Sequence, residues 1–293
     1  MQYPQTSSNA CFCTLAVGNR YRRHAVMLAS DLQTHAPTIP LLILTNRVSA
    51  FRHFPNVIAI AHRLQSVKGY HDKLFVVEQA LSRFEVCTFL DSDVRVLGPV
   101  PPDLDWAPGL TARHGCNILK HNTTPRVRAA LPVIQEVASR LNLNLMKVSW
   151  LHEFMFTVRR QAGAELAFLE AWSALSQHFE LQGIHDGEGN VMGLAAAIAG
   201  LSMQFDKHDR FPIFKDNIER DRIKQGLSRP DRAAAYFDAH RAIEYPQRMI
   251  VEKAARKVGQ SVARRYRALR LKVSMTRRDA LLNLQQTTLA GRS

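Results

Sequence analysis

Short apolar runs alternate with segments of helical periodicity over roughly the first hundred residues, and this alternation limits the fold more than any other feature of the sequence. Four runs predict buried strands, at residues 10–17, 40–46, 56–61 and 86–90. Two segments with apolar residues every three or four positions predict helices, at residues 19–34 and 72–82. The resulting order βαββαβ is typical of an α/β fold, in which a mostly parallel sheet is flanked by helices.

The later sequence follows a less regular pattern. Its predicted helices are at residues 126–142, 163–178 and 191–199, and its predicted strands are at residues 154–158, 203–205 and 211–214. A proline-rich loop at residues 98–109 precedes the first of these helices, and a glycine-rich loop at residues 183–189 precedes the last. We place a boundary near Pro246, which separates an α/β domain at residues 1–246 from a basic helical tail at residues 247–293.

The positive charge of the chain is concentrated in this tail. The formal net charge is +14, and residues 248–278 supply +10 of it through eleven Lys or Arg against the single acid Glu252. The rest of the chain is only mildly basic, so we expect no nucleic-acid partner.

The tail also carries an apolar stripe. Between Ile250 and Val273, apolar residues recur at spacings of three and four, and basic residues surround them. An amphipathic basic helix of this kind can lie on an anionic membrane surface. It can equally pack on the main domain or meet another subunit, and the sequence leaves these alternatives open.

The cellular location is constrained by what the sequence lacks. Its longest apolar stretches are too short to cross a bilayer, and the start MQYPQTSSNA has no basic residues followed by an apolar run, so we expect no secretory signal. The four cysteines form no paired CxxC units, so we expect buried free thiols rather than a zinc site. These features predict a cytoplasmic protein, either fully soluble or peripheral on the cytoplasmic face of a membrane.

Asp91 and Asp93, with Ser92 between them, directly follow the apolar run VCTFL. The carboxyl end of a strand is where α/β sheets bind ligands. Two carboxylates two residues apart can share one hard cation, Mn²⁺ or Mg²⁺, and leave positions for phosphate oxygens. The bare pattern is weak, because Asp103 and Asp105 repeat it, but that pair lies among prolines with no apolar run before it. We therefore predict a metal site at the first pair and a solvated loop at the second.

The segment YHDKLFVVEQALSRFEVCTFLDSDVRVLGP, residues 70–99, resembles the GT-A glycosyltransferases, and among them the glycogenin-like and lipopolysaccharide-glucosyltransferase-like group. In that pattern a basic residue opens a helix, an apolar strand follows, and an Asp-x-Asp ends the strand. The likeness covers roughly the first hundred residues well and the rest in outline. It implies a GT-A type, Rossmann-like fold and a metal-dependent transferase. The donor would be a nucleotide sugar, often UDP-linked, and the acceptor a glycan or a lipid-linked sugar.

The resemblance also implies substrate-binding residues. Lys73 stands where such enzymes have a basic residue that steadies the donor near the Asp-x-Asp, in which Ser92 is the central residue; a solvated lysine at a helix start is the alternative. Asn46 ends the second predicted strand, so it can hydrogen-bond a nucleobase or ribose, or else serve as a turn residue or helix N-cap.

The loop GIHDGEGN, residues 183–190, resembles the acidic loop-to-helix segment on the acceptor side of these transferases. Glu188, or failing it Asp186, can orient an acceptor hydroxyl, act as a base, or stabilise positive charge at the anomeric carbon. Both acids also suit a helix start for electrostatic reasons alone. Glu153, which begins another strand-like segment, is a weaker candidate for the acceptor site.

His240 occupies the late position at which metal-dependent relatives complete the metal shell with a histidine. Imidazole can join two carboxylates around manganese. The Gly and Lys-Pro-Trp that usually follow this histidine are missing, and a surface histidine is the alternative interpretation.

Other functions fit parts of the pattern. A haloacid-dehalogenase-like phosphatase would use Asp91 as a nucleophile and Asp93 as an acid/base, but its motif normally ends the first strand, and here about three strands precede it. A sugar nucleotidyltransferase usually opens with a glycine-rich basic loop, which VGNRYRR matches poorly. A non-catalytic, membrane-tethered transferase-like domain is the non-enzymatic alternative.

Overall fold

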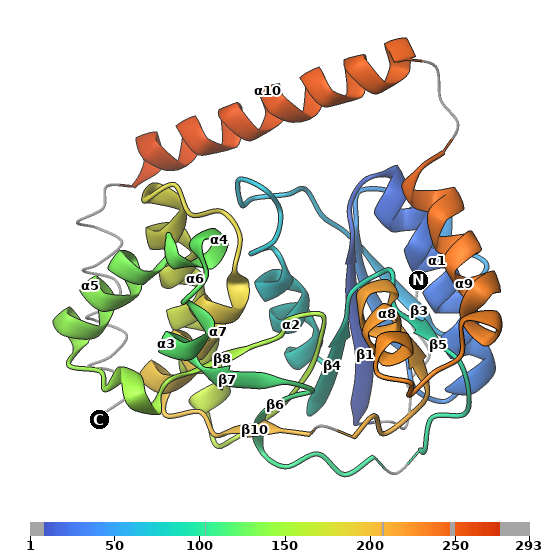
Figure 1. Ribbon diagram of the computed structural model, residues 1–293, viewed down its shortest axis with the longest axis horizontal. Coiled ribbons are helices and arrows are strands. Elements are labelled where there is room, and N and C mark those ends of the chain that lie inside the picture. The colour runs from blue at the N-terminus through green and yellow to red at the C-terminus, as the bar shows by residue number, and fades with distance from the viewer. Residues whose placement is uncertain (1–8, 103, 207, 247–249, 276–293) are drawn as a thin grey trace. The chain divides into compact units, whose positions relative to one another are not determined.

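The computed structural model describes residues 9–102, 104–206, 208–246 and 250–275, and its main feature is a seven-stranded sheet (Figure 1). The strand order is β10-β6-β9-β4-β1-β2-β3. These strands are β1 (Ala10–Ala16), β2 (Leu41–Thr45), β3 (Val57–Ala61), β4 (Val86–Leu90), β6 (Gly109–Ala112), β9 (Met155–Arg159) and β10 (Met203–Phe205). The β1–β2, β2–β3 and β10–β6 pairs are parallel, and β6–β9 is antiparallel. The predicted α/β fold with a mostly parallel sheet is confirmed.

The chain divides into two compact units. Unit 1 comprises Met1–Arg63, Phe89–Asp105 and Asp209–Arg256, and unit 2 comprises Leu64–Thr88, Trp106–His208 and Lys257–Ser293. The predicted boundary near Pro246 stays a prediction, because residues 247–249 lie outside the described residues.

Unit 1 is built on β1, β2 and β3. Continuous apolar runs make β1 and β2 buried strands, which pair in register from Phe12 beside Leu41 to Ala16 beside Thr45. Its other elements are α1 (Asn19–His35), η1 (Val48–Phe51), β5 (Arg95–Val96), β11 (Ile213–Phe214), α8 (Asp216–Lys224) and α9 (Pro230–Glu244). Helix α1 packs on β1, on β5 and on α9.

Unit 2 contains β6, β9 and β10 together with a small antiparallel pair, β7 (Gly115–Asn117) and β8 (Ser149–Leu151). Its helices are α2 (Lys73–Leu81), α3 (Ile118–His121), α4 (Pro125–Arg128), α5 (Leu131–Leu141), α6 (Ala164–Leu181) and α7 (Glu188–Ala199), with the 3-10 turn η2 (Leu145–Lys147). Phe156, Phe168 and Trp172 pack edge-on or tilted in its core, where aromatic rings contribute most of the buried area.

Two glycines of α7 let the backbone of β8 approach closely. A Cβ on Gly189 would lie 2.1 Å from the carbonyl oxygen of Leu151, and one on Gly193 would lie 1.8 Å from that of Ser149. The glycine and alanine content of this helix therefore serves packing against a strand.

The predicted helix at residues 126–142 is two helices, α4 and α5. Pro132 occupies the first turn of α5, where its missing N–H is tolerated, but the same residue cannot continue the hydrogen bonds of α4. Helix α7 begins at Glu188, three residues before the predicted start at residue 191, so the glycine-rich loop is shorter than expected.

The tail forms the long helix α10 (Ile250–Ser274), drawn in orange-red in Figure 1. Its predicted apolar stripe is exposed: Val258, Val262, Tyr266, Leu269 and Val273 are 61–80% accessible. Arg267 donates to the carbonyl oxygen of Val67 at 2.8 Å and Arg270 to that of Gln65 at 3.4 Å, so these two side chains join α10 to the loop before α2. The rest of the predicted tail, residues 276–293, lies outside the described residues.

Two further expectations can be compared with the structure. Among the helices in the described residues, none combines the length and the hydropathy that a membrane span requires. Cys11, Cys13 and Cys87 are buried free thiols, as predicted, and Cys116 is a half-buried one.

Candidate functional site

Asp91 and Asp93 lie at the carboxyl end of β4, in unit 1. The chain turns at once, with the N–H of Val94 donating to the carbonyl oxygen of Asp91 at 3.0 Å, and continues into β5. Strand β5 pairs antiparallel with β11 so that Phe214 stands opposite Arg95. This register brings the residue that follows β11, Lys215, to the two aspartates.

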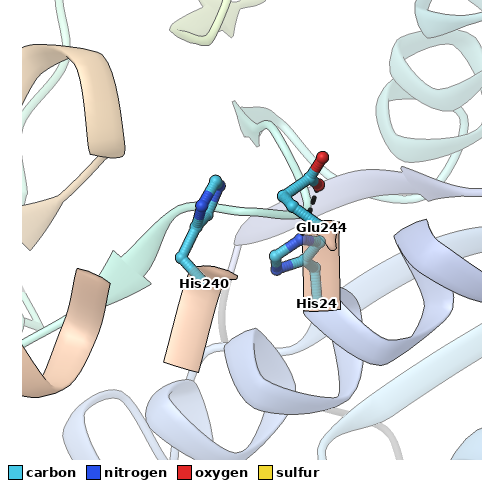
Figure 2. A group of neighbouring side chains, drawn as sticks. All are labelled: His24, His240 and Glu244. Carbon is cyan, nitrogen blue, oxygen red and sulfur yellow. Dashed lines mark hydrogen bonds and ion pairs between the residues drawn. The ribbon is translucent and has the colours of Figure 1, made fainter. Parts of the chain in front are cut away.

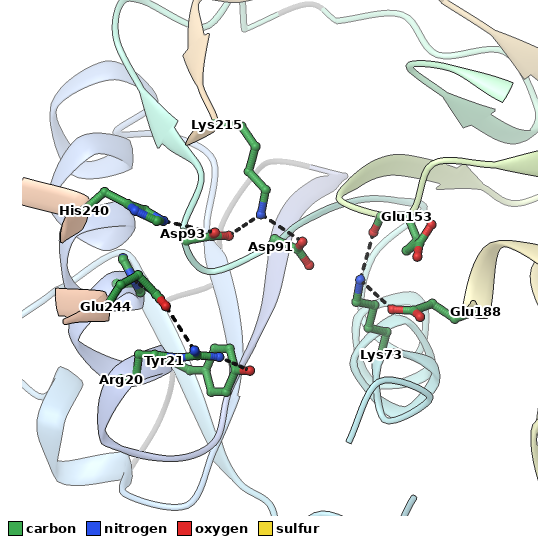
Figure 3. A network of polar contacts seen from close by, with 11 residues as sticks. Arg20, Tyr21, Lys73, Asp91, Asp93, Glu153, Glu188, Lys215, His240 and Glu244 are labelled. Carbon is green, nitrogen blue, oxygen red and sulfur yellow. Dashed lines mark hydrogen bonds and ion pairs between the residues drawn. The ribbon is translucent and has the colours of Figure 1, made fainter. Parts of the chain in front are cut away.

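Lys215 bridges the two carboxylates (Figure 3). Its Nζ lies 3.1 Å from Oδ2 of Asp91 and 2.5 Å from Oδ1 of Asp93. Burial alone would lower the pKa of this ammonium, but the two neighbouring carboxylates outweigh it and raise the pKa of Lys215. Lys215 is therefore an ammonium at neutral pH, and it offsets one of the two carboxylate charges.

His240, on α9, reaches Asp93 from another side. Its Nε2 lies 3.6 Å from Oδ2 of Asp93, and this contact with the carboxylate is the main cause of a raised pKa of His240. Burial by itself would raise the pKa of Asp93, yet Lys215 and His240 together hold it below its usual range. The structure thus brings His240 to the Asp-x-Asp pair, and its service as a metal ligand stays a prediction.

A second group of side chains surrounds Glu244, at the end of α9 (Figure 2). Its Oε1 lies 3.0 Å from Nε2 of His24, and its Oε2 accepts from Nη1 of Arg20 at 3.0 Å. The rings of His24 and His240 are 5.1 Å apart, and His24, His240 and Glu244 offer three ligand atoms within 4.8 Å of one another. The packing of α1 against α9 brings these residues together.

The donor chemistry at the end of β4 fits a divalent metal. Carboxylate oxygens and one imidazole, supplied by Asp91, Asp93 and His240, are ligands that Mn²⁺ accepts. The carboxylates are already neutralised in part by Lys215, so a metal would compete with this ammonium for the same two carboxylates.

Unit 2 holds the predicted residues of the acceptor side together with Lys73, which we predicted to steady the donor (Figure 3). Nζ of Lys73 lies 3.0 Å from Oε1 of Glu188 and donates to the carbonyl oxygen of Glu153 at 3.0 Å. Both Lys73 and Glu188 are buried. Asp186 is exposed and forms an ion pair with Lys68 at 3.1 Å. Of the two acidic candidates in the loop, Glu188 is the one held in a fixed position.

The remaining predicted residues lie in unit 1. Oδ1 of Asn46 accepts from the N–H of Gly18 at 3.1 Å and from Nη1 of Arg22 at 2.7 Å, so it joins the end of β2 to the turn before α1. Ser92 is buried. In the second Asp-x-Asp pair, Asp105 is exposed, as predicted for a loop residue, and Asp103 lies outside the described residues.

Unit 1 also has an open cavity of about 490 Å³ between α1, η1 and α9. Its polar lining includes Arg22, Arg23 and Arg47, and its apolar lining includes Met27 and Ile243. Three guanidinium groups around one cavity suit an anionic ligand.

Sequence reasoning missed Lys215, His24, Glu244 and Arg20. Their partners are separated from them by between 122 and 224 positions, so no local spacing marks them. The one available signal was the apolar run FPIF before Lys215, which predicted a strand without revealing its partner.

No family model matches the chain, and no curated protein matches it. Several solved structures are similar to it. The bifunctional glycosyltransferase WbbM is 13% identical with a TM-score of 0.43, over 69% of this chain and 39% of that protein. The glycosyltransferase GlyE of Streptococcus pneumoniae is 12% identical with a TM-score of 0.45, over 68% and 46%.

The chain thus spans less than half the length of either protein. The galactosyltransferase LgtC, in complex with donor and acceptor sugar analogs, is 13% identical with a TM-score of 0.42, over 72% of this chain and 82% of that one. All three solved proteins are glycosyltransferases by name, and at 12–13% identity the likeness concerns the fold alone.

Proposed function

We propose that the chain is a glycosyltransferase that moves a sugar from a nucleotide-sugar donor, UDP-linked, to a hydroxyl group of an acceptor. The observation that supports it most is the convergence of Asp91, Asp93 and His240 at the carboxyl end of β4. A strand end is where an α/β sheet binds its ligand, and two carboxylates with an imidazole suit the cation that a diphosphate requires.

In this proposal Asp91, Asp93 and His240 hold Mn²⁺ or Mg²⁺, which when bound neutralises the charge that develops on the departing nucleoside diphosphate. Asn46 and Ser92 belong to the donor side. Asn46 acts there mainly by fixing the loop beside α1 through its hydrogen bonds to Gly18 and Arg22.

Glu188 is the acidic residue proposed for the acceptor side, where it orients the hydroxyl, accepts its proton, or stabilises positive charge at the anomeric carbon. Lys73 is then a positioning residue, because its ammonium holds the carboxylate of Glu188 at 3.0 Å. Glu153 contributes through its backbone, which accepts from the same ammonium. Asp186 is the weaker candidate because it is solvent-exposed.

The test measures release of UDP from a panel of UDP-sugars with Mn²⁺ or Mg²⁺ present. Asp91→Asn and Asp93→Asn should abolish release, whereas Asp105→Asn, an exposed member of the second Asp-x-Asp pair, should leave it unchanged. Equal activity of Asp91→Asn and the unchanged protein would contradict the proposed site.

A phosphatase remains a second candidate because Lys215 contacts Asp91, and a cation beside a carboxylate nucleophile suits phosphoryl transfer. Release of inorganic phosphate from p-nitrophenyl phosphate, with no release of UDP from any donor, would favour it. Asp91 follows the fourth strand along the chain, whereas the phosphatase motif normally ends the first strand, and this difference favours the transferase.

We further propose that α10 attaches the protein to an anionic lipid surface, which would place it on the cytoplasmic face of a membrane and suit a lipid-linked acceptor. The exposed stripe from Val258 to Val273 supports this, because its large apolar side chains are 61–80% accessible while Arg267 and Arg270 bond the loop before α2. Exposed basic side chains flank the stripe, at Lys257, Arg264, Arg265 and Lys272. Each cation near an anionic surface contributes on the order of 1 kcal/mol.

Co-sedimentation with vesicles rich in phosphatidylserine tests the attachment. The unchanged protein should bind and should dissociate at high salt. The double variant Val262→Asp/Leu269→Asp should remain in solution, while Leu227→Asp, which changes an exposed leucine outside α10, should bind normally. Normal vesicle binding of the double variant would refute the proposal.

A further inference from the structure

Lys215 lies where two carboxylates converge, and it is held there by the fold. The preceding strand β11 pairs with β5, and the ring of Phe214 is buried against Tyr236 and Phe237, with ring centres 5.5 and 5.1 Å away. On its other side, the carbonyl oxygen of Lys215 accepts from the N–H of Glu219 at 2.8 Å, at the start of α8. The backbone of Lys215 is therefore fixed, and the freedom that remains is that of its flexible four-carbon stem.

The ammonium of Lys215 contacts Oδ2 of Asp91 and Oδ1 of Asp93, which are oxygens that a hard divalent cation would use as ligands. A positive group at that position also repels an approaching dication, and it does so strongly because Lys215 is largely buried. The ammonium and a metal therefore exclude each other from the carboxylates.

We propose that Lys215 is the resident counter-cation of Asp91 and Asp93, which leaves them when a divalent metal binds and then pairs with the phosphates of the nucleoside diphosphate. This inference rests on the proposed function. Metal and diphosphate then bind together, because the metal needs the carboxylates that Lys215 occupies and the displaced ammonium needs a new anion.

The expected size of the effect follows from the competition. The apparent affinity for a metal equals the intrinsic affinity multiplied by the fraction of time for which the carboxylates are free of the ammonium. If that fraction is roughly 1–10%, removal of the ammonium tightens metal binding roughly 10- to 100-fold. The same removal costs the diphosphate one charged contact, which weakens its binding roughly tenfold or more.

The experiment uses the full chain and two binding measurements. The dissociation constant of Mn²⁺ alone is obtained from loss of the free Mn²⁺ signal in electron paramagnetic resonance, and that of UDP at saturating Mn²⁺ from calorimetry. Lys215→Met should bind Mn²⁺ at least about tenfold more tightly and UDP more weakly. Lys224→Met, which alters an exposed lysine of α8, should change neither constant.

The proposal predicts that the dissociation constants of Mn²⁺ and UDP change in opposite directions. General damage to the site would instead weaken the binding of both ligands. Lys215→Arg retains the cation in a fork that matches carboxylates, so it should bind Mn²⁺ more weakly than the unchanged protein. This second variant tests the proposal even if Lys215→Met does not fold. Unchanged or weaker Mn²⁺ binding by folded Lys215→Met, or unchanged binding by Lys215→Arg, would overturn it.

Asp91→Asn separates this inference from the proposed function. If Asp91→Asn weakens Mn²⁺ binding while Lys215→Met leaves it unchanged, the metal site stands and the counter-cation inference fails. If Mn²⁺ binding is indifferent to Asp91→Asn, the metal site itself is wrong and both fail.

Discussion

Glu180 offers a quantitative test of the electrostatics of unit 2. It lies on α6 and is 7% exposed, and its Oε1 accepts from the N–H of Val67 at 2.7 Å. Burial raises the pKa of Glu180 from its ordinary value of 4.5 to about 7, although the hydrogen bond from Val67 lowers it in part. The neighbouring Asp72 raises this pKa further, and Arg267 of α10 lowers it.

A pKa that is higher in the folded than in the unfolded state means that the folded state prefers the protonated carboxyl. The stability from this preference is fully present below the unfolded pKa and is lost as pH rises through the folded one. For Glu180 the loss occurs between pH 4.5 and about 7. At about 1.4 kcal/mol for each pKa unit, it amounts to about 3 kcal/mol of unfolding free energy.

The perturbation is Glu180→Gln, which keeps an oxygen for the N–H of Val67 and removes the titration. Urea unfolding of both proteins at pH 5 and pH 8 gives the free energies. Relative to the unchanged protein, Glu180→Gln should be more stable at pH 8 than at pH 5 by about 2.5 kcal/mol, because part of the loss has already occurred at pH 5 and other titrating groups cancel in the difference. Glu78→Gln, which replaces an exposed glutamate of α2, should show no such dependence. A stability difference that is the same at both pH values would refute the reasoning.

Three further substitutions test the packing and chemistry of unit 2. Gly193→Ala should destabilise the fold by about 3 kcal/mol or more in urea unfolding, since its Cβ would lie 1.8 Å from the carbonyl oxygen of Ser149. Asn190→Leu should cost roughly 1–3 kcal/mol in the same assay, because Nδ2 of Asn122 donates to Oδ1 of Asn190 at 2.8 Å inside the core and would lose that partner. Glu188→Gln should lower the rate of sugar transfer at saturating donor while leaving the donor dissociation constant unchanged; a weaker donor affinity with normal turnover would assign it to the donor side.

Strands β1, β2 and β4 were predictable because they are buried on both faces. The run at residues 86–90 coincides with β4, and the predicted first strand ends one residue beyond β1. In a chain where short continuous apolar runs alternate with helices, such a run is typical of a buried strand and of few other structures.

The helices α8 and α9 were not predicted because they bury little. In α8 the buried residue is Glu219, and in α9 the buried residues are Ala233 and Ile243. A helix that presents so few apolar residues to the core lacks the periodicity on which sequence reasoning depends. His240 could therefore be proposed for the site only through a family resemblance, and Glu244 could not be proposed at all.

The glycines of α7 illustrate how a correct observation can support two mechanisms. Small residues after Glu188 would also allow a ligand to approach the backbone closely. The structure uses Gly189 and Gly193 for the carbonyl oxygens of β8 instead. This packing nonetheless bears on chemistry, because it fixes the start of α7 and with it Glu188, whose carboxylate then meets Lys73 at 3.0 Å. A Cβ at position 189 would lie 2.1 Å from the carbonyl oxygen of Leu151 and 3.0 Å from Oε2 of Glu153. A larger residue than Gly189 would therefore displace the start of α7 and, with it, the carboxylate of Glu188. The glycines thus act on the candidate site through the position of α7, and no inspection of the sequence alone distinguishes that role from contact with a ligand.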